Sequence, residues 1–143
     1  MMRKIKELYI KNKEIINYLI FGFLTTVVSL LVYYILTFTI IDPNRSLELQ
    51  LANIISWIAG VAFAYITNRK YVFESKNNNV KKELSSFVGA RIITLIMDML
   101  IMYIGVTVLK GNDKILKLIS QIIVIVSNYI FSKIFVFKNK RDN

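Results

Sequence analysis

The third apolar stretch of the sequence, "SFVGARIITLIMDMLIMYIGV", contains two ionisable residues, Arg91 and Asp98. A spacing of seven places both side chains on one face of an α-helix, about 10 Å apart along its axis. A charge in lipid costs at least about 2.5–3.5 kcal/mol on insertion scales, so such residues usually face a bundle interior and mark a pathway. The alternatives are structural: Arg91 extends to the cytoplasmic interface, and Asp98 is protonated or hydrogen-bonded to a neighbouring helix.

Polar side chains in the second and fourth apolar stretches complete this candidate set. At a rise of about 1.5 Å per residue, Asn68, Arg91 and Asn128 all fall in the cytoplasmic half, and we expect them to converge on one site. Lys117 falls about 12 Å from the membrane centre on the outer side, with Asp98 near the centre. A guanidinium with amide donors suits a cluster of phosphate oxygens.

These residues require helices that cross a membrane. The chain has 143 residues, of which 55% are hydrophobic, above the 45–50% usual for soluble proteins. A hydrocarbon core of about 30 Å needs about 20 helical residues. We therefore predict an all-α membrane protein with a basic cytoplasmic N-terminal segment at 1–15, a four-helix transmembrane domain at 16–137 and a basic cytoplasmic tail at 138–143. The four transmembrane helices are expected at about 16–41, 49–72, 85–109 and 114–137.

The net charge of +10 lies mainly at the ends of the apolar stretches and not along one face of a soluble domain. We therefore expect a membrane surface, and no nucleic acid, as the partner of these cations. Lysine and arginine are most abundant in the N-terminal segment, the middle loop and the C-terminal end, which places both termini in the cytoplasm. Lys110, Lys114 and Lys117, around the last outer loop, weaken this contrast without reversing it.

Composition also limits the chemistry. The chain has no histidine and no cysteine, so the commonest general base, the commonest metal ligand and any thiolate site are missing. Paired carboxylates and nucleophile–base sets are missing as well. We predict no catalytic residue, no metal, no cofactor and no enzymatic activity.

An internal repeat relates the second and fourth stretches. A shift of 64 residues lays "YITNRKYVF" on "YIFSKIFVF", with the shared pattern Y-I-x-x-[RK]-x-[YF]-V-F. This predicts two helical hairpins related as a parallel repeat, a common way to build a transport path. The aromatic residues fall where interfacial belts form, and they serve either as anchors or as the shaped edge of a headgroup site. They are Tyr71, Phe73, Phe135 and Phe137.

Small residues recur at every fourth position of the second stretch, at Ala52, Ser56, Gly60 and Ala64. Such a ridge allows two helices to approach closely in lipid. Helix packing is therefore the favoured interpretation of these four residues.

Four segments of the chain together carry a resemblance to a known family: "YLIFGFLTTVVSLLVYYIL", "ANIISWIAGVAFAYITNRKYVFESK", "FVGARIITLIMDMLIMY" and "KLISQIIVIVSNYIFSKIFVFK". They resemble the GtrA-like family of small four-helix bacterial membrane proteins, most closely its GtcA-type teichoic-acid glycosylation branch. The resemblance covers about residues 15–140. It implies flipping of a polyprenyl-phosphate-linked monosaccharide, such as an undecaprenyl-phosphate sugar, across the cytoplasmic membrane of a bacterium. An external glycosyltransferase would then transfer the sugar to a surface polymer.

Matched position by position, the resemblance implies a set of residues that bind the lipid phosphate or the sugar: Ala64, Asn68, Val72, Phe73, Phe87, Arg91, Lys117 and Asn128. To these we add Asp98 from its depth and Arg69 from its place beside Asn68. The chain departs from the family at Thr25 and Ser29, where many members have asparagine and aspartate. A carboxylate role there falls to Asp98.

Two other functions remain open at this point. A non-transporting scaffold for a polytopic glycosyltransferase would tolerate charge removal and depend on the small-residue ridge. A small multidrug exporter would require an essential membrane carboxylate, for which Asp98 is the only candidate. Candidate protein partners are the glycosyltransferase and further copies of the chain.

Overall fold

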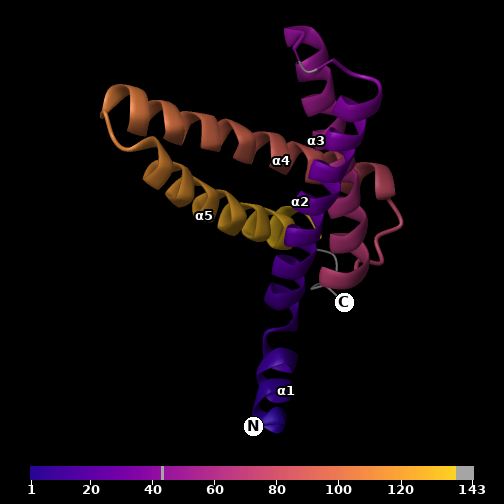
Figure 1. Cartoon of the computed structure of the whole chain (residues 1–143). Coiled ribbons are helices and arrows are strands. Elements are labelled where there is room, and N and C mark those ends of the chain that lie inside the picture. Colours follow the sequence, from indigo (N-terminus) through magenta and orange to yellow (C-terminus); the bar gives the residue numbers. More distant parts are fainter. Residues whose placement is uncertain (43, 138–143) are drawn as a thin grey trace. The chain divides into compact units, whose positions relative to one another are not determined.

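The computed structural model describes residues 1–42 and 44–137, and the basic tail expected at 138–143 lies outside these ranges. The elements are α1 (Met2–Lys11), α2 (Lys13–Thr39), α3 (Ser46–Thr67) continued by the π-helical turn η1 (Asn68–Val72), α4 (Val80–Met102) continued by η2 (Tyr103–Val108), and α5 (Asp113–Phe131) continued by η3 (Ser132–Val136). The described residues include no β-strand. The all-α prediction is therefore confirmed (Figure 1).

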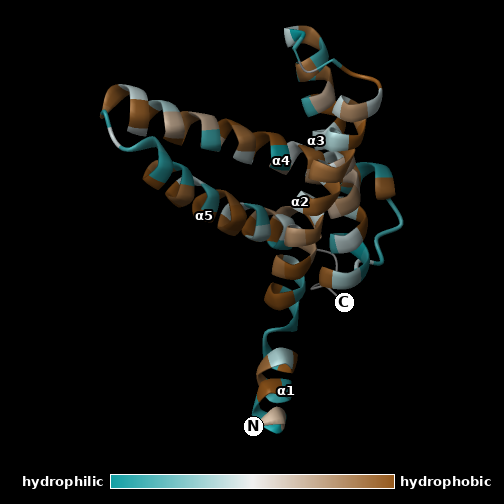
Figure 2. Ribbon diagram, in the orientation of Figure 1, coloured by the Kyte–Doolittle hydropathy of each residue, from teal (hydrophilic) through white to brown (hydrophobic). Residues whose placement is uncertain are grey.

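Four helical segments are long and apolar enough to cross a membrane: Lys13–Thr39, Ser46–Val72, Val80–Val108 and Asp113–Val136. Apolar residues dominate these four segments, while the connecting segments are mainly polar (Figure 2). On α2, for example, Leu31 and Phe38 are 56% and 83% exposed. Apolar surface of this extent is not stable in water, and we conclude that these helices face lipid.

The chain forms two compact units, Met1–Glu74 and the part from Ser75 onward. In the first unit, α2 and α3 pack along each other. A Cβ atom on Gly60 would lie 3.3 Å from Cβ of Ser29, and the Ser29 hydroxyl donates a hydrogen bond of 3.0 Å to the carbonyl oxygen of Ser56. The ridge residues Ala52, Ser56, Gly60 and Ala64 are all buried. The ridge therefore serves close helix contact, as its spacing indicated.

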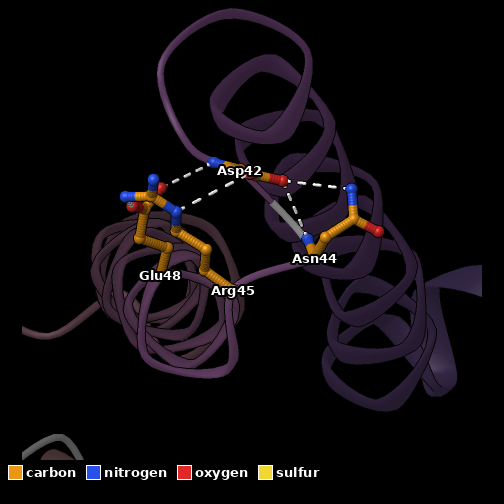
Figure 3. Close-up of polar contacts among 4 residues, drawn as sticks. All are labelled: Asp42, Asn44, Arg45 and Glu48. Carbon is orange, nitrogen blue, oxygen red and sulfur yellow. Dashed lines mark hydrogen bonds and ion pairs between the residues drawn. The ribbon is translucent and has the colours of Figure 1, made fainter.

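The connection between α2 and α3 is held by a small polar cluster (Figure 3). Asp42 accepts hydrogen bonds from the backbone and side-chain nitrogens of Asn44, at 3.0 and 3.1 Å. Glu48 accepts one from the Asp42 backbone, at 2.7 Å, and one from the Arg45 guanidinium, at 3.1 Å. Glu48 lies in the first turn of α3, where a carboxylate is favoured by the helix dipole. The charge of Arg45 is thus compensated within the loop.

In the second unit, α4 and α5 form a hairpin, and Leu116 of α5 packs on two glycines near its closed end. A Cβ atom on Gly105 or Gly111 would lie 2.8 or 2.7 Å from Cδ1 of Leu116. Leu116 therefore packs directly on the backbone of the turn. The Asn112 side chain accepts hydrogen bonds from the backbone nitrogens of Lys114 and Ile115 and so caps the start of α5.

The repeated Val-Phe segments have the same local geometry in both units. The backbone nitrogen of Phe73 donates to the carbonyl oxygen of Asn68 at 2.8 Å, and that of Phe137 donates to Ser132 at 2.9 Å. Both hydrogen bonds join residues five positions apart, as in a π-helix. Such turns are rare in proteins as a whole, and those that occur are often found at functional sites. Phe73 and Phe137 are both 2% exposed, whereas Tyr71 is 45% and Phe135 66% exposed. Only the outer member of each aromatic pair is thus placed to anchor the protein in an interface.

Candidate functional site

The second unit brings Asp98 and Lys117 together. Nζ of Lys117 lies 2.7 Å from Oδ2 of Asp98, and the Ser120 hydroxyl donates a 2.6 Å hydrogen bond to Oδ1. Ser120 is fully buried, while the side chains of Lys117 and Asp98 are 49% and 17% exposed. Both oxygens of the carboxylate are therefore occupied, and the cation at one end of the pair remains accessible.

Arg91 lies in the middle of α4 with an aromatic ring as its neighbour. Its Cζ atom is 4.8 Å from the centroid of the Phe87 ring, a distance at which a cation is attracted to the ring face. Phe87 is fully buried, and its ring lies 6.1 Å from that of Phe137. Within the described part of the chain, Arg91 forms no ion pair with a carboxylate. Its charge is held in place by the ring and is free for an anion.

Thr94 joins α4 to α5 between these two charged positions. Its hydroxyl lies 2.8 Å from Oδ1 of Asn128 and 3.0 Å from the carbonyl oxygen of Arg91. Thr94 and Asn128 are 2% and 7% exposed. Because Asn128 Oδ1 accepts this contact, the amide nitrogen remains available to donate.

Four α4 residues, Phe87, Arg91, Thr94 and Asp98, thus lie on one helix face and form a stripe along α4. Their spacings of four, three and four residues are those of a single helix stripe. The stripe carries a cation and a carboxylate, and Asn128 and Lys117 meet it from α5. Such a stripe suits a ligand that combines an anion with hydrogen-bonding groups.

The first unit holds the remaining candidates at the end of α3. Ala64, Asn68, Val72 and Phe73 are all buried, and Arg69 is half-buried. Oδ1 of Asn68 is buried without a hydrogen-bond partner among the described residues. An unpaired buried acceptor costs about 1–3 kcal/mol, which makes Asn68 a candidate for contact with a ligand that donates a hydrogen bond. Convergence of Asn68 with Arg91 and Asn128 stays a prediction.

Three polar residues of the second unit were not among the sequence candidates. Thr94 and Ser120 carry buried hydroxyls. Thr94 lies three positions after Arg91, and Ser120 lies three positions after Lys117. This helical spacing from a charged candidate is the sequence feature that could have identified them. Glu83 is 2% exposed and accepts a 2.6 Å hydrogen bond from the Ser75 hydroxyl. Glu83 lies in the first turn of α4, where acidic residues are common and usually exposed, so the sequence did not distinguish it. Among the described residues, no group of three acidic side chains could hold a metal ion.

Ser29 contributes to the packing of α2 against α3. Its hydroxyl donates to the Ser56 carbonyl oxygen and its Cβ lies beside Gly60. The hydroxyl of Thr25 is likewise engaged, with the carbonyl oxygen of Phe21 at 2.8 Å. These two hydroxyls therefore support the α2–α3 hairpin.

Replacing Thr94 by valine is expected to destabilise the α4–α5 hairpin by about 1–3 kcal/mol, because Asn128 Oδ1 loses its donor in the interior. Thermal unfolding of the purified protein in detergent would measure the change. Thr94→Ser is the control, since it keeps the hydroxyl. Equal stability of Thr94→Val and the wild type would contradict the contribution of this hydrogen bond.

Comparison with known proteins gives a consistent result. Residues 17–137 match the model of the family described as "GtrA/DPMS, transmembrane domain". The chain is 38% identical over 131 residues to the cell wall teichoic acid glycosylation protein GtcA of Listeria monocytogenes, covering 90% of this chain and 87% of the relative. The GtcA protein of Listeria innocua gives the same identity and coverage. The uncharacterized membrane protein YwcD of Bacillus subtilis is 34% identical over 128 residues, covering 87% of this chain and 97% of the relative. No solved structure matches the chain significantly.

Proposed function

Because the chain belongs to the GtrA/DPMS transmembrane domain family, we propose that this multi-pass bacterial membrane protein flips a polyprenyl-phosphate-linked monosaccharide across the cytoplasmic membrane. The sugar would be used for glycosylation of a cell-wall polymer such as teichoic acid, the process named for its Listeria relatives. Synthesis of the lipid on one side and its consumption on the other would drive net exchange.

The observation that carries this proposal is the state of Arg91. A guanidinium in a segment apolar enough to cross a membrane stands against the Phe87 ring at 4.8 Å and has no carboxylate partner among the described residues. An uncompensated cation in lipid is costly and usually functional. A lipid phosphate supplies the missing negative charge, and the planar fork of arginine binds two phosphate oxygens at once.

Three further side chains are assigned roles in the proposal. Asn128 offers its amide nitrogen to the headgroup, since its oxygen already contacts Thr94, whose hydroxyl also lies 3.0 Å from the carbonyl oxygen of Arg91. The unpaired Oδ1 of Asn68 is assigned to a hydroxyl of the sugar, because an acceptor needs a donor and an ionised phosphodiester has none. Lys117, half exposed beside Asp98, supplies the second cation along the path.

The competing functions are less well supported by the contacts. The scaffold depends on the small-residue ridge of α3, but this ridge is buried, and Gly60 packs on Ser29. The multidrug exporter needs an available carboxylate, whereas both oxygens of Asp98 are bound by Lys117 and Ser120. Both observations favour a site for an anionic lipid.

Reconstitution into liposomes with a polyprenyl-phosphate sugar tests the proposal directly. The wild type is expected to equilibrate the lipid between leaflets, scored by access of an impermeant reagent to the sugar. Absence of exchange by the wild type would favour the scaffold function.

Asn68→Leu provides a sharper comparison in the same assay. Removing the unpaired acceptor is expected to leave thermal stability unchanged or raise it by about 1 kcal/mol, while leaflet exchange is lost. Asn17→Leu is the matched control. Asn17 accepts a hydrogen bond from Tyr9 and donates one to the carbonyl oxygen of Tyr71, at 3.1 and 3.3 Å, so its replacement should lower stability. A destabilised Asn68→Leu protein would indicate a structural role for this asparagine.

A further inference from the structure

The fourth membrane segment, Asp113–Val136, contains a glutamine to which the proposed function gives no role. Gln121 lies about 5 Å from the midpoint of this segment, at a rise of about 1.5 Å per residue. It is exposed, and its side chain forms no hydrogen bond with any described residue. Water is absent from the hydrocarbon core, so an amide without a partner is costly there. Polar residues kept at such a depth usually serve a function.

Gln121 belongs to the polar side of α5. It follows Lys117 by four residues and precedes Asn128 by seven, so at about 100° per residue the three side chains fall within an arc of about 40°. Lys117 and Asn128 both meet the stripe of α4, through contacts with Asp98 at 2.7 Å and with Thr94 at 2.8 Å. Gln121 therefore lies between two residues that contact the stripe, and on the same side of α5.

The glutamine also shortens a long apolar interval on this side of the helix. Lys117 and Asn128 are 11 residues apart, which is about 16 Å along the axis. The residues from Ile122 to Val126 are all apolar. A polar headgroup that moves between the levels of Lys117 and Asn128 therefore meets the amide of Gln121 between them, with its oxygen and its nitrogen both unoccupied.

The polar groups of the α4 stripe at this depth are already engaged. Both oxygens of Asp98 are bound by side chains of α5, and the Thr94 hydroxyl also contacts α5. Arg91 is turned from Asp98 by only about 20° around α4, so it lies on the side of α4 where Asp98 meets Lys117. This side of the hairpin thus carries cations at two levels, with the uncommitted amide of Gln121 between them.

The chemistry of an amide decides which part of the headgroup it fits. An amide both donates and accepts hydrogen bonds, and so does a hydroxyl group. An ionised phosphate only accepts, so it would leave the amide oxygen of Gln121 unpaired, and its charge is matched by Arg91 and Lys117 instead. We propose that Gln121 binds a hydroxyl group of the sugar near the centre of the membrane and so makes the protein prefer lipid that carries a sugar over the bare lipid phosphate. The inference rests on the proposed function and adds a residue that determines its specificity.

Gln121→Met tests this role, because methionine has a similar length and shape but no donor and only a weak acceptor. Gln50→Met is the matched control, since it makes the same change at the other glutamine of the chain, an exposed residue near the start of α3. Leaflet exchange in liposomes is measured for two lipids. One is the polyprenyl-phosphate hexose that the wild type exchanges fastest, chosen from glucose, galactose and N-acetylglucosamine, and the other is polyprenyl phosphate without a sugar. An impermeant diol oxidant reports the first lipid and an impermeant phosphatase the second.

The wild type is expected to exchange the hexose lipid faster than polyprenyl phosphate. Gln121→Met should slow exchange of the hexose lipid about tenfold and leave that of polyprenyl phosphate within about twofold, because only the hydrogen bonds to the sugar are lost. Its thermal stability in detergent should equal that of the wild type, since Gln121 forms no hydrogen bond in the folded chain. Gln50→Met should behave as the wild type with both lipids.

Three results would overturn the role of Gln121. The first is unchanged exchange of the hexose lipid by Gln121→Met, and the second is an equal loss of exchange for both lipids. The third is a lower oligomeric mass of Gln121→Met in detergent, which would place Gln121 between copies of the chain. Failure of the wild type to exchange any of these lipids would instead overturn the proposed function.

Discussion

Alanine in place of Arg91 is expected to abolish glycosylation of the surface polymer while the protein still inserts into the membrane. A charge-assisted hydrogen bond contributes about 1.5–3 kcal/mol, so the loss of two to a lipid phosphate weakens binding about 100-fold or more. Insertion should survive, because removal of a cation from a membrane segment lowers its transfer cost. Sugar content of the isolated cell-wall polymer, measured beside the amount of protein in the membrane fraction, checks both parts.

Arg91→Lys separates charge from geometry at the same position. Lysine keeps the cation but not the planar fork, and it stacks less well on Phe87. We therefore expect partial glycosylation by Arg91→Lys, at a level between that of the Arg91→Ala variant and that of the wild type. Full activity of Arg91→Ala would remove Arg91 from the headgroup site.

Neutralising one member of the Asp98–Lys117 pair is expected to have the second large effect, on stability. Either Asp98→Ala or Lys117→Ala leaves the other charge uncompensated in a membrane segment, at a cost of about 2.5–3.5 kcal/mol. The pair is joined at 2.7 Å and is further bonded to the buried Ser120. Thermal unfolding in detergent and the amount of protein in the membrane would both decrease.

Exchange of the two charges distinguishes structure from transport. The double variant Asp98→Lys, Lys117→Asp keeps one ion pair between α4 and α5, so much of the stability should return. Leaflet exchange should not, because the accessible cation no longer lies at position 117. Arg3→Gln is the control for loss of an ion pair as such, since the Arg3–Glu7 pair is largely exposed and contributes little. Recovery of both stability and exchange by the double variant would assign the pair a purely structural role.

Several features of the protein were predictable from the sequence because they depend only on residues that are close together in the chain. Hydropathy adds over about 20 residues, so the four membrane-crossing helices follow from composition alone. The spacing of Arg91 and Asp98 defines one helix face whatever packs against it. The four-residue spacing of the ridge likewise indicated helix packing.

Other features depend on how one helix is shifted along its neighbour, and periodicity does not contain that information. Sequence placed Lys117 and Asp98 at different depths, but the register of α4 against α5 joins them directly at 2.7 Å. The same register makes Thr94 and Ser120 the hydrogen-bond partners of Asn128 and Asp98.

The ends of the second and fourth membrane helices illustrate the division most clearly. The sequence by itself determined that a cation and a Tyr/Phe-Val-Phe pattern close two membrane helices. Only the tertiary structure showed π-helical turns there, which bury Phe73 and Phe137 and leave Tyr71 and Phe135 outside. The reason is physical: a π-turn forms when backbone bonds shift by one residue to fit local packing, and no side-chain period records that shift.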